Sequence, residues 1–303
     1  MSLGLMFAGQ GTQHPNMLPW LDEADPLVQR TLAMLGITDW RLSLGDADWA
    51  VGNRQAQVLL TGLDLAAWNQ LAARLPAPAA IAGYSVGELA AFSAAGVFDA
   101  TTALDLAVLR AQAMDLCARQ APGGLLSVSG LSRSVVDALC EGAGVGVAID
   151  IDEETRVVGG PADRLGALAS RASDLGAKVG RLGVSVASHT PSMQPAAEAF
   201  AAELARVKRH APRLPLFSNA TGGRINDGAQ ATRVLAQQIA RTVRWSDVLE
   251  AMHARRPACV LEIGPGSALA SMWNRRFPDV PARAADEFRS SDALVRWVDR
   301  HMP

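Results

Sequence analysis

The stretch that decides the fold is AAIAGYSVGELAA, residues 79–91. Its apolar first part, 79–82, predicts a buried strand, and the alanine- and leucine-rich part after Gly87 predicts a helix. A serine between two glycines at such a junction is typical of a nucleophile elbow, in which a sharp turn presents the hydroxyl at the helix N-terminus. Ser85 is therefore the candidate nucleophile. A structural turn serine stays the alternative, because G-x-S-x-G patterns also arise by chance.

Other strand candidates flank this stretch on both sides. A short apolar run at 5–8 leads into the glycine-rich segment 9–11, and another at 258–261 leads into the segment 264–266. Longer segments with a helical spacing of alanine and leucine separate these runs. Short buried strands that alternate with helices predict a mostly parallel sheet in a large α/β domain, and the serine elbow makes that domain α/β-hydrolase-like.

The middle of the chain has a different pattern. Strand-like and helix-like segments follow one another in the order β-α-β-β-α-β, which is that of the ferredoxin-like arrangement. We therefore expect a ferredoxin-like subdomain at 124–188, inserted into a large α/β domain made of residues 1–123 and 189–303. The expected strands cover 125–130, 145–151, 156–158 and 178–186, and the expected helices cover 132–141 and 162–176.

Composition argues against several classes of protein. Hydrophobic residues make up 49% of the 303 residues and charged residues 19%, which is enough apolar material for a sizeable core. The net charge of -2 argues against a nucleic-acid partner, because counterion release needs a basic surface. No apolar run is long enough to span a membrane, and the first basic residue, Arg30, comes too late for a secretory signal. Three isolated cysteines without metal-type spacing predict a cytoplasmic protein with no metal site.

His189, within the segment SHTP at 188–191, is the best candidate among five histidines for a general base. It follows a strand that is expected to end at Val186, and active sites of α/β proteins gather at the carboxyl ends of strands. From that position it would take the proton of Ser85 during nucleophilic attack. A lone histidine is equally often a hydrogen-bonded loop or core residue, so both interpretations stay open at this point.

Two further features are candidates for substrate binding. Arg110 lies among the apolar residues of a helical segment, 103–110, with Met114 one turn later on the same face. A partly buried arginine would suit a substrate with a free carboxylate, although most arginines are solvated. The backbone N–H groups of Gln10 and Val86 could form an oxyanion hole, but on spacing alone the glycine-rich segment is equally well a strand-exit turn.

These residues together resemble a known family, the malonyl-CoA:acyl-carrier-protein transacylases, which are acyltransferases of fatty-acid and polyketide synthesis. The resemblance extends in order over essentially the whole chain, and it is therefore far more specific than one G-x-S-x-G pattern. The matching segments are FAGQGTQ (7–13), GYSVGELAA (83–91), LRAQAM (109–114), VSVASHTPSMQPAAE (184–198), VRWSDVLEAM (243–252) and LEIGPGSAL (261–269).

The resemblance implies an acyltransferase that forms a malonyl-serine intermediate on Ser85. It implies that His189 is the base, oriented by the backbone carbonyl of Gln238 instead of an aspartate. It also implies an oxyanion hole made of the backbone amides of Gln10 and Val86.

The resemblance implies a substrate site as well. Arg110 would bind the malonyl carboxylate, and Met114 and the region of Gln238 would line the acyl pocket. The implied partners are malonyl-CoA and an acyl-carrier protein whose prosthetic thiol accepts the acyl group, with no tightly bound cofactor.

Two rival classes share some of these features. An α/β-hydrolase-type thioesterase would also carry G-x-S-x-G, but it would normally have an HGGG-type segment and an acid that precedes the histidine. Neither stands out before His189. A non-catalytic module that docks a carrier protein is the second rival, and the intact set of Ser85, His189 and Arg110 argues against it.

Two segments depart from the family pattern. Tyr84 stands where most members have histidine, and residues 150–154 (DIDEE) are acidic where members have an asparagine-rich segment. A G-Y-S-V-G-E elbow is similar to that of the epsilon subunit of biotin-independent malonate decarboxylase, which loads malonyl onto that enzyme's carrier protein. We therefore expect the chain to load the carrier subunit of a malonate decarboxylase. The alternative is a malonyl-CoA:acyl-carrier-protein transacylase of fatty-acid or polyketide synthesis.

Overall fold

A six-stranded sheet forms the centre of the large domain in the computed structural model, which describes residues 2–302. The strands lie in the order β10-β9-β1-β2-β7-β8; the β7–β8 pair is antiparallel, and the other neighbouring pairs are parallel. The predicted mostly parallel sheet is thus confirmed. The strands are β1 (Leu3–Phe7), β2 (Pro78–Gly83), β7 (Leu216–Phe217), β8 (Arg224–Ile225), β9 (Cys259–Ile263) and β10 (Ala282–Ala284).

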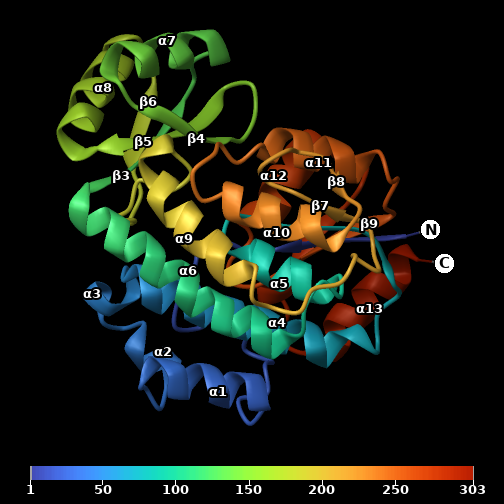
Figure 1. Ribbon diagram of the computed structural model, residues 1–303. Coiled ribbons are helices and arrows are strands. Elements are labelled where there is room, and N and C mark those ends of the chain that lie inside the picture. The colour runs from blue at the N-terminus through green and yellow to red at the C-terminus, as the bar shows by residue number, and fades with distance from the viewer. Residues whose placement is uncertain (1, 303) are drawn as a thin grey trace.

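Helices cover both faces of this sheet (Figure 1). Side chains alternate across a strand, so Leu5 and Phe7 of β1 join a core with α4, α5 and α6, whereas Met6 joins a core with α11 and α12. The helices of the large domain are α1 (Pro26–Leu35), α2 (Trp40–Ser43), α3 (Ala47–Ala50), α4 (Asn53–Ala72), α5 (Gly87–Ala94), α6 (Ala100–Gln120), α9 (Gln194–Leu204), α10 (Gly228–Gln237), α11 (Trp245–His253), α12 (Ala268–Arg276) and α13 (Ser291–His301), with 3₁₀ turns at Pro191–Met193 and Ala285–Glu287.

A second, antiparallel sheet lies to one side of the large domain, at the upper left of Figure 1. Its strand order is β4-β5-β3-β6, and α7 and α8 pack on it around a small apolar core of their own. The chain order β3-α7-β4-β5-α8-β6 confirms the predicted ferredoxin-like arrangement. The elements are β3 (Gly123–Ser129), α7 (Arg133–Ala143), β4 (Gly146–Asp150), β5 (Thr155–Pro161), α8 (Ala162–Asp174) and β6 (Lys178–Arg181).

The last strand of this subdomain is shorter than expected. We predicted a strand over 178–186, but β6 ends at Arg181 and the chain then continues without regular structure towards His189. Val186 is buried in the core of the large domain, so the alternating valines of this segment reflect a crossing between two cores and not a longer strand. This correction matters for the position of His189.

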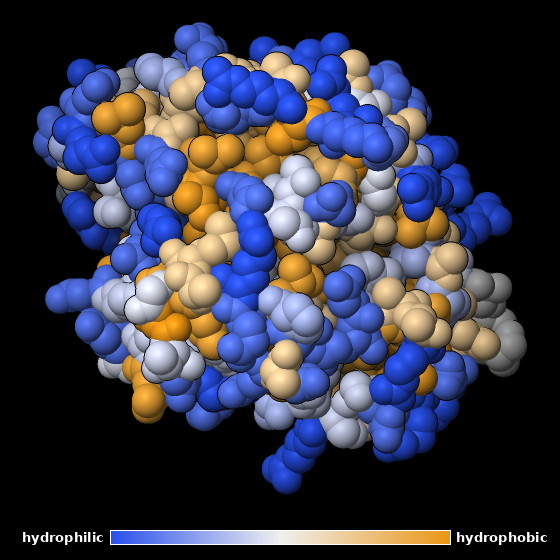
Figure 2. All heavy atoms as spheres, turned by 60° about the horizontal axis from the view of Figure 1, so that its bottom comes forward, coloured by the Kyte–Doolittle hydropathy of each residue, from blue (hydrophilic) through white to orange (hydrophobic). Residues whose placement is uncertain are grey.

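Polar side chains cover most of the face of the molecule that Figure 2 shows. Apolar side chains lie between them, and the broadest apolar area is near the upper middle of the view. Large apolar side chains that do reach the surface, such as Leu42 and Leu116, lie on separate helices. Among residues 2–302, every helix is too short or too polar to cross a membrane.

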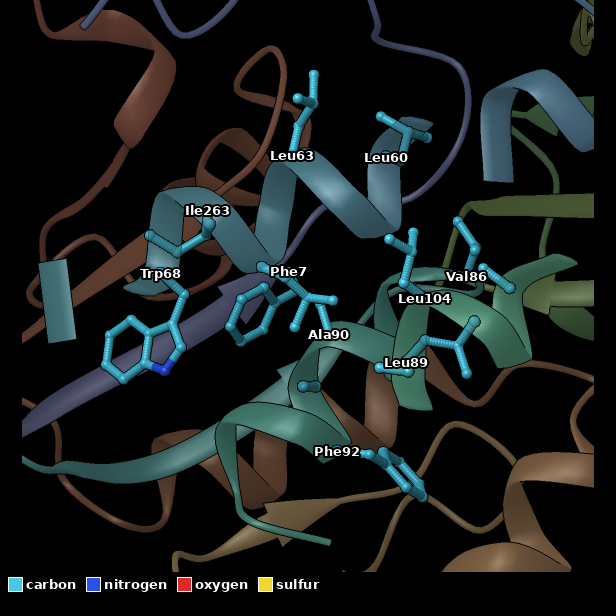
Figure 3. Close-up of a cluster of buried hydrophobic side chains, with 14 of the residues drawn as sticks. Phe7, Leu60, Leu63, Trp68, Val86, Leu89, Ala90, Phe92, Leu104 and Ile263 are labelled. Carbon is cyan, nitrogen blue, oxygen red and sulfur yellow. The ribbon is translucent and has the colours of Figure 1, made fainter. Parts of the chain in front are cut away.

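The core beside β1 is closely packed. Figure 3 shows Phe7 of β1 together with Trp68 of α4 and Ala90 of α5, and the rings of Phe7 and Trp68 meet edge to face at 6.4 Å. Helix α4 carries Gly62 where it meets α1. A Cβ atom added at Gly62 would lie 1.9 Å from Oγ1 of the buried Thr31, so the two helices need a glycine at this contact.

We expect Gly62→Ala to lower the free energy of unfolding by about 1–3 kcal/mol, because the new methyl group would overpack the contact with Thr31. The matched control is Gly166→Ala in α8, where nothing lies within 4 Å of the added Cβ. That change should raise stability by about 0.5–1 kcal/mol, because alanine favours helix. Urea unfolding measures both, and equal stability of the two variants would contradict the packing argument.

Candidate active site

Ser85 lies at the turn between β2 and α5 in a left-handed backbone conformation, with φ at +55°. Close backbone packing fixes this turn. A Cβ atom on Gly83 would lie 2.1 Å from the backbone of Gly87, and a Cβ atom on Gly87 would lie 2.5 Å from the carbonyl oxygens of Phe7 and Ala8. The predicted sharp turn at Ser85 is therefore confirmed, and the two glycines relieve crowding around it.

Asn219 holds the turn from the opposite side, and sequence patterns did not single it out. Its Oδ1 accepts from the N–H of Ser85 at 2.8 Å, and its Nδ2 donates to the carbonyl of Gly83 at 2.7 Å. The Asn219 side chain is buried, and its amide supplies the hydrogen bonds that the backbone groups of the strained turn would otherwise make with water. An asparagine two residues after the short strand β7 is a weak signal in the sequence, and only the tertiary structure shows its role.

His189 is hydrogen-bonded to the candidate nucleophile. Its Nε2 lies 2.7 Å from Oγ of Ser85, and its Nδ1 lies 2.6 Å from the backbone carbonyl of Gln238. A carbonyl oxygen can only accept, so Nδ1 carries the proton and Nε2 is free to accept from the serine hydroxyl. Burial, aided by the positive charge of Arg110, lowers the pKa of His189 to about 3. The imidazole is therefore neutral at neutral pH, which is the form a general base requires.

The segment that positions His189 next to Ser85 differs from the one expected. The sequence predicts that His189 follows a strand ending at Val186, at the carboxyl edge of a sheet, and this prediction is wrong because β6 ends at Arg181. Its φ is +64°, and its own N–H donates to the carbonyl of Ile239 at 2.8 Å. The loop after α10 and not a strand end therefore positions the imidazole.

Arg110 of α6 is buried, which excludes the solvated alternative. Its NH1 donates to Oε1 of Gln57 at 2.6 Å and its NH2 to Oε1 of Gln238 at 3.1 Å, while Nε has no acceptor among residues 2–302. Burial lowers its pKa to about 10, and the charge of Glu88 opposes that change. The guanidinium thus stays charged at neutral pH, and its hydrogen-bond partners are neutral amides.

Gln238 connects these groups. Its backbone carbonyl accepts from His189, its side-chain Oε1 accepts from Arg110, and its Nε2 donates to the carbonyl of Ser85 at 2.8 Å. Met114 lies beside Gln57, whose Nε2 is 3.4 Å from the methionine sulfur. The structure thus brings Met114 and Gln238 into the neighbourhood of Arg110, and their role in an acyl pocket stays a prediction.

Glu88, the residue that follows the second glycine of the elbow, is a further buried acid at this site. Its Oε1 accepts from the N–H of Asn219 at 2.6 Å. Burial raises the pKa of Glu88 to about 8, and the Asn219 hydrogen bond, the Gln238 side chain and the Arg110 charge act in the opposite direction. A carboxyl group that is largely protonated at neutral pH leaves most of the Arg110 charge uncompensated.

The two backbone amides expected to form an oxyanion hole lie on neighbouring segments. The N–H of Tyr84 donates to the carbonyl of Phe7 at 2.9 Å, which places the loop after β1 alongside the elbow. Within residues 2–302, the N–H groups of Gln10 and Val86 have no protein acceptor. Both are therefore available to a ligand, and their joint role stays a prediction.

The acidic segment 150–154 contributes to the contact between the two domains. Asp150 lies 3.2 Å from Arg133 and 3.3 Å from Arg156, and Arg133 also donates to the hydroxyl of Ser246 on α11. A cavity of about 500 Å³ lies between this segment and helices α11 and α12. No cluster of three or more metal-ligating side chains occurs within residues 2–302.

Comparison with known proteins places the chain among acyltransferases. The acyl transferase domain family matches residues 5–290. A malonyl CoA-acyl carrier protein transacylase from Escherichia coli is 30% identical over 295 residues, which are 93% of this chain and 95% of that protein. The solved malonyl CoA-acyl carrier protein transacylase of Coxiella burnetii has a TM-score of 0.90 at 26% identity and covers 100% of this chain and 98% of its own.

A second solved structure contains a carrier protein. It is a malonyl-transacylase in complex with a type II polyketide-synthase acyl-carrier protein, with a TM-score of 0.89 at 27% identity and coverage of 98% of this chain and 99% of its own. These relatives support the broader resemblance to carrier-protein transacylases. The narrower resemblance to the malonate decarboxylase subunit, which depends on Tyr84, is not shown by them.

The lowered pKa of His189 predicts a flat pH profile for the reaction of Ser85 with an activated ester such as p-nitrophenyl acetate. An exposed imidazole would lose its basic form on acidification through its ordinary pKa of about 6.5. With a folded-state pKa of about 3, His189 stays neutral across that range. We expect the second-order rate constant to change less than about twofold between about pH 5.5 and 7.5. Ser85→Ala serves as the blank, and a roughly tenfold fall over this interval would contradict the prediction.

Proposed function

Because this chain belongs to the acyl transferase family, we propose that it moves a malonyl group from malonyl-CoA to the thiol of an acyl-carrier protein through a malonyl ester of Ser85. The observation that carries the proposal is the buried arrangement of a Ser85–His189 pair beside a charged Arg110. A hydroxyl with a neutral base provides acyl transfer, and a buried guanidinium provides recognition of an acyl group with a free carboxylate.

In the first half-reaction, Oγ of Ser85 attacks the thioester carbonyl while Nε2 of His189 takes the hydroxyl proton. The oxyanion that forms would be bound by the backbone amides of Gln10 and Val86, each worth about 3 kcal/mol in comparable sites. The C–S bond then breaks, and CoA leaves as the thiol with the proton that His189 returns. The second half-reaction runs in reverse, with the carrier thiol as the attacking group, so the kinetics are ping-pong.

The hydrogen bond from His189 to Gln238 makes an aspartate unnecessary in this scheme. The carbonyl of Gln238 orients the imidazole and selects the tautomer whose Nε2 accepts a proton. An imidazolium formed during the reaction is then stabilised by a dipole and not by a full charge, so the proton returns readily to the leaving thiol. This property suits an enzyme that must run the same step in both directions.

Arg110 would select the acyl group. The bonds from its NH1 and NH2 go to side-chain amides of Gln57 and Gln238, which an incoming carboxylate can replace without moving another charge. A malonyl carboxylate would then pair with the guanidinium in a two-bond geometry. An acetyl group would leave the buried charge unpaired, and acetyl-CoA should therefore be a poor substrate.

The relatives favour a particular class of carrier. They are transacylases of carrier proteins, and one was solved with a polyketide-synthase carrier. The proposed role is therefore the loading of a fatty-acid or polyketide carrier, in place of the malonate decarboxylase carrier that Tyr84 had suggested.

We expect Arg110→Ala to lower kcat/KM for malonyl-CoA by about 100- to 1000-fold, because a buried charge pair worth about 3–4 kcal/mol is lost. Activity with acetyl-CoA should be retained or increased. Arg119→Ala, an exposed arginine later on the same helix, is the matched control and should leave both activities unchanged. CoA release from each donor measures the effect. Equal loss with both donors would assign Arg110 a structural role.

Carrier choice is tested by offering two carriers to the wild-type protein with malonyl-CoA as donor. One carries phosphopantetheine, as in fatty-acid synthesis, and the other carries the longer phosphoribosyl-dephospho-CoA arm of malonate decarboxylase. We expect malonyl transfer, followed by mass spectrometry of the carrier, to favour the phosphopantetheine carrier by about tenfold or more, a difference of about 1.4 kcal/mol. Preference for the longer arm would restore the decarboxylase interpretation. CoA release with neither carrier loaded would indicate a thioesterase.

A further inference from the structure

We propose that Tyr84 is a positioning residue for the acyl transfer, because its ring contacts both Gly9 and Trp245 and thereby fixes the loop that carries the Gln10 amide relative to the Val86 amide. The inference rests on the proposed function, in which these two amides bind the oxyanion. It concerns the residue at which this chain departs from the histidine usual in its family.

Gly9 packs directly against Tyr84 on one side. A Cβ atom added at Gly9 would lie 2.5 Å from the carbonyl oxygen of Tyr84 and 2.8 Å from Cδ1 of its ring. The N–H of Tyr84 also donates to the carbonyl of Phe7 at 2.9 Å. The loop after β1 is therefore held against Tyr84 both before and at Gly9, the residue that precedes Gln10.

Trp245 also packs against the Tyr84 ring. The two rings meet edge to face, with centroids 5.0 Å apart and planes at 87°. Trp245 is fully buried at the start of α11, and the apolar cluster around it includes Ile149 of the small subdomain and Val248 of α11. This buried, packed partner limits the movement of the Tyr84 ring.

This packing acts on the oxyanion hole through short pieces of backbone. Gln10 is the next residue after Gly9, and Val86 is two residues after Tyr84. Amide donors stabilise an oxyanion only when both lie about 2.7–3.1 Å from it, and a displacement of about 1 Å costs on the order of 100-fold in rate. The contact between Tyr84 and Gly9 is thus placed where it sets the separation of the two donors.

The ring of Tyr84, and not its hydroxyl, makes the contacts that position the loop. Burial raises the pKa of the Tyr84 hydroxyl, and no hydrogen bond within residues 2–302 contributes to that change. The contacts of the side chain are those of Cδ1 with Gly9 and of the ring with Trp245. Phenylalanine should therefore replace tyrosine here, and alanine should not.

The test compares Tyr84→Ala, Tyr84→Phe and the wild type in steady-state malonyl transfer from malonyl-CoA to a phosphopantetheine carrier, with CoA release as the signal. We expect Tyr84→Ala to lower kcat by about 10- to 100-fold with KM within about twofold, because the lost contact matters only in the transition state. Tyr84→Phe should stay within about twofold of the wild type in both constants. Phe288→Ala, which removes a buried ring that packs near Trp297 of α13, controls for loss of core packing alone.

A second variant approaches the same contact from the other side. Gly9→Ala keeps Tyr84 but pushes the loop away from it, so kcat should again fall with little change in KM. This variant decides the matter if Tyr84→Ala does not fold. Losses in kcat no larger than that of Phe288→Ala, a rise confined to KM, or equal losses in Tyr84→Ala and Tyr84→Phe would each overturn the inference. Absence of CoA release by the wild type would instead refute the proposed function.

Discussion

Gln238 makes three hydrogen bonds that join the nucleophile, the base and the candidate substrate arginine into one unit. Its backbone carbonyl accepts from His189, while its side chain accepts from Arg110 and donates to the backbone of Ser85. Arg110, His189 and Gln238 are buried. Loss of one hydrogen-bond partner would therefore leave a buried polar group that water could not satisfy. The geometry of the site therefore depends on the end of α10, which carries Gln238.

The electrostatics of the site follow from burial. The same low-polarity surroundings that keep His189 neutral also raise the pKa of Glu88, while Arg110 remains charged because its pKa falls only to about 10. The site thus combines a neutral base with one uncompensated positive charge, held by amide side chains and not by an acid. This combination separates two tasks, proton transfer at His189 and recognition of a negative charge at Arg110.

Local patterns predicted the elements well and their limits less well. The period of apolar residues and the positions of glycine gave the strand–turn–helix at Ser85 and the β-α-β-β-α-β order of the subdomain. They failed over 178–186, where alternating valines belong to two different cores and the strand ends at Arg181. Asn219 and Glu88 were not singled out, because the hydrogen bonds of Asn219 with Ser85 and with Glu88 span 134 and 131 positions of the chain.

The sequence by itself determined the elbow around Ser85, because Gly83 is required by contacts within the turn itself; Gly87 is required by the tertiary contact with Phe7 and Ala8. It also determined, by the order of its motifs, which serine, histidine and arginine are candidates. Only the tertiary structure decided how they meet. The hydrogen bonds of Gln238 to Ser85 and Arg110 span 153 and 128 positions of the chain. Such contacts depend on the packing of whole helices against the sheet. The local periodicity of apolar residues and the spacing of motifs do not encode contacts between residues so far apart in the sequence.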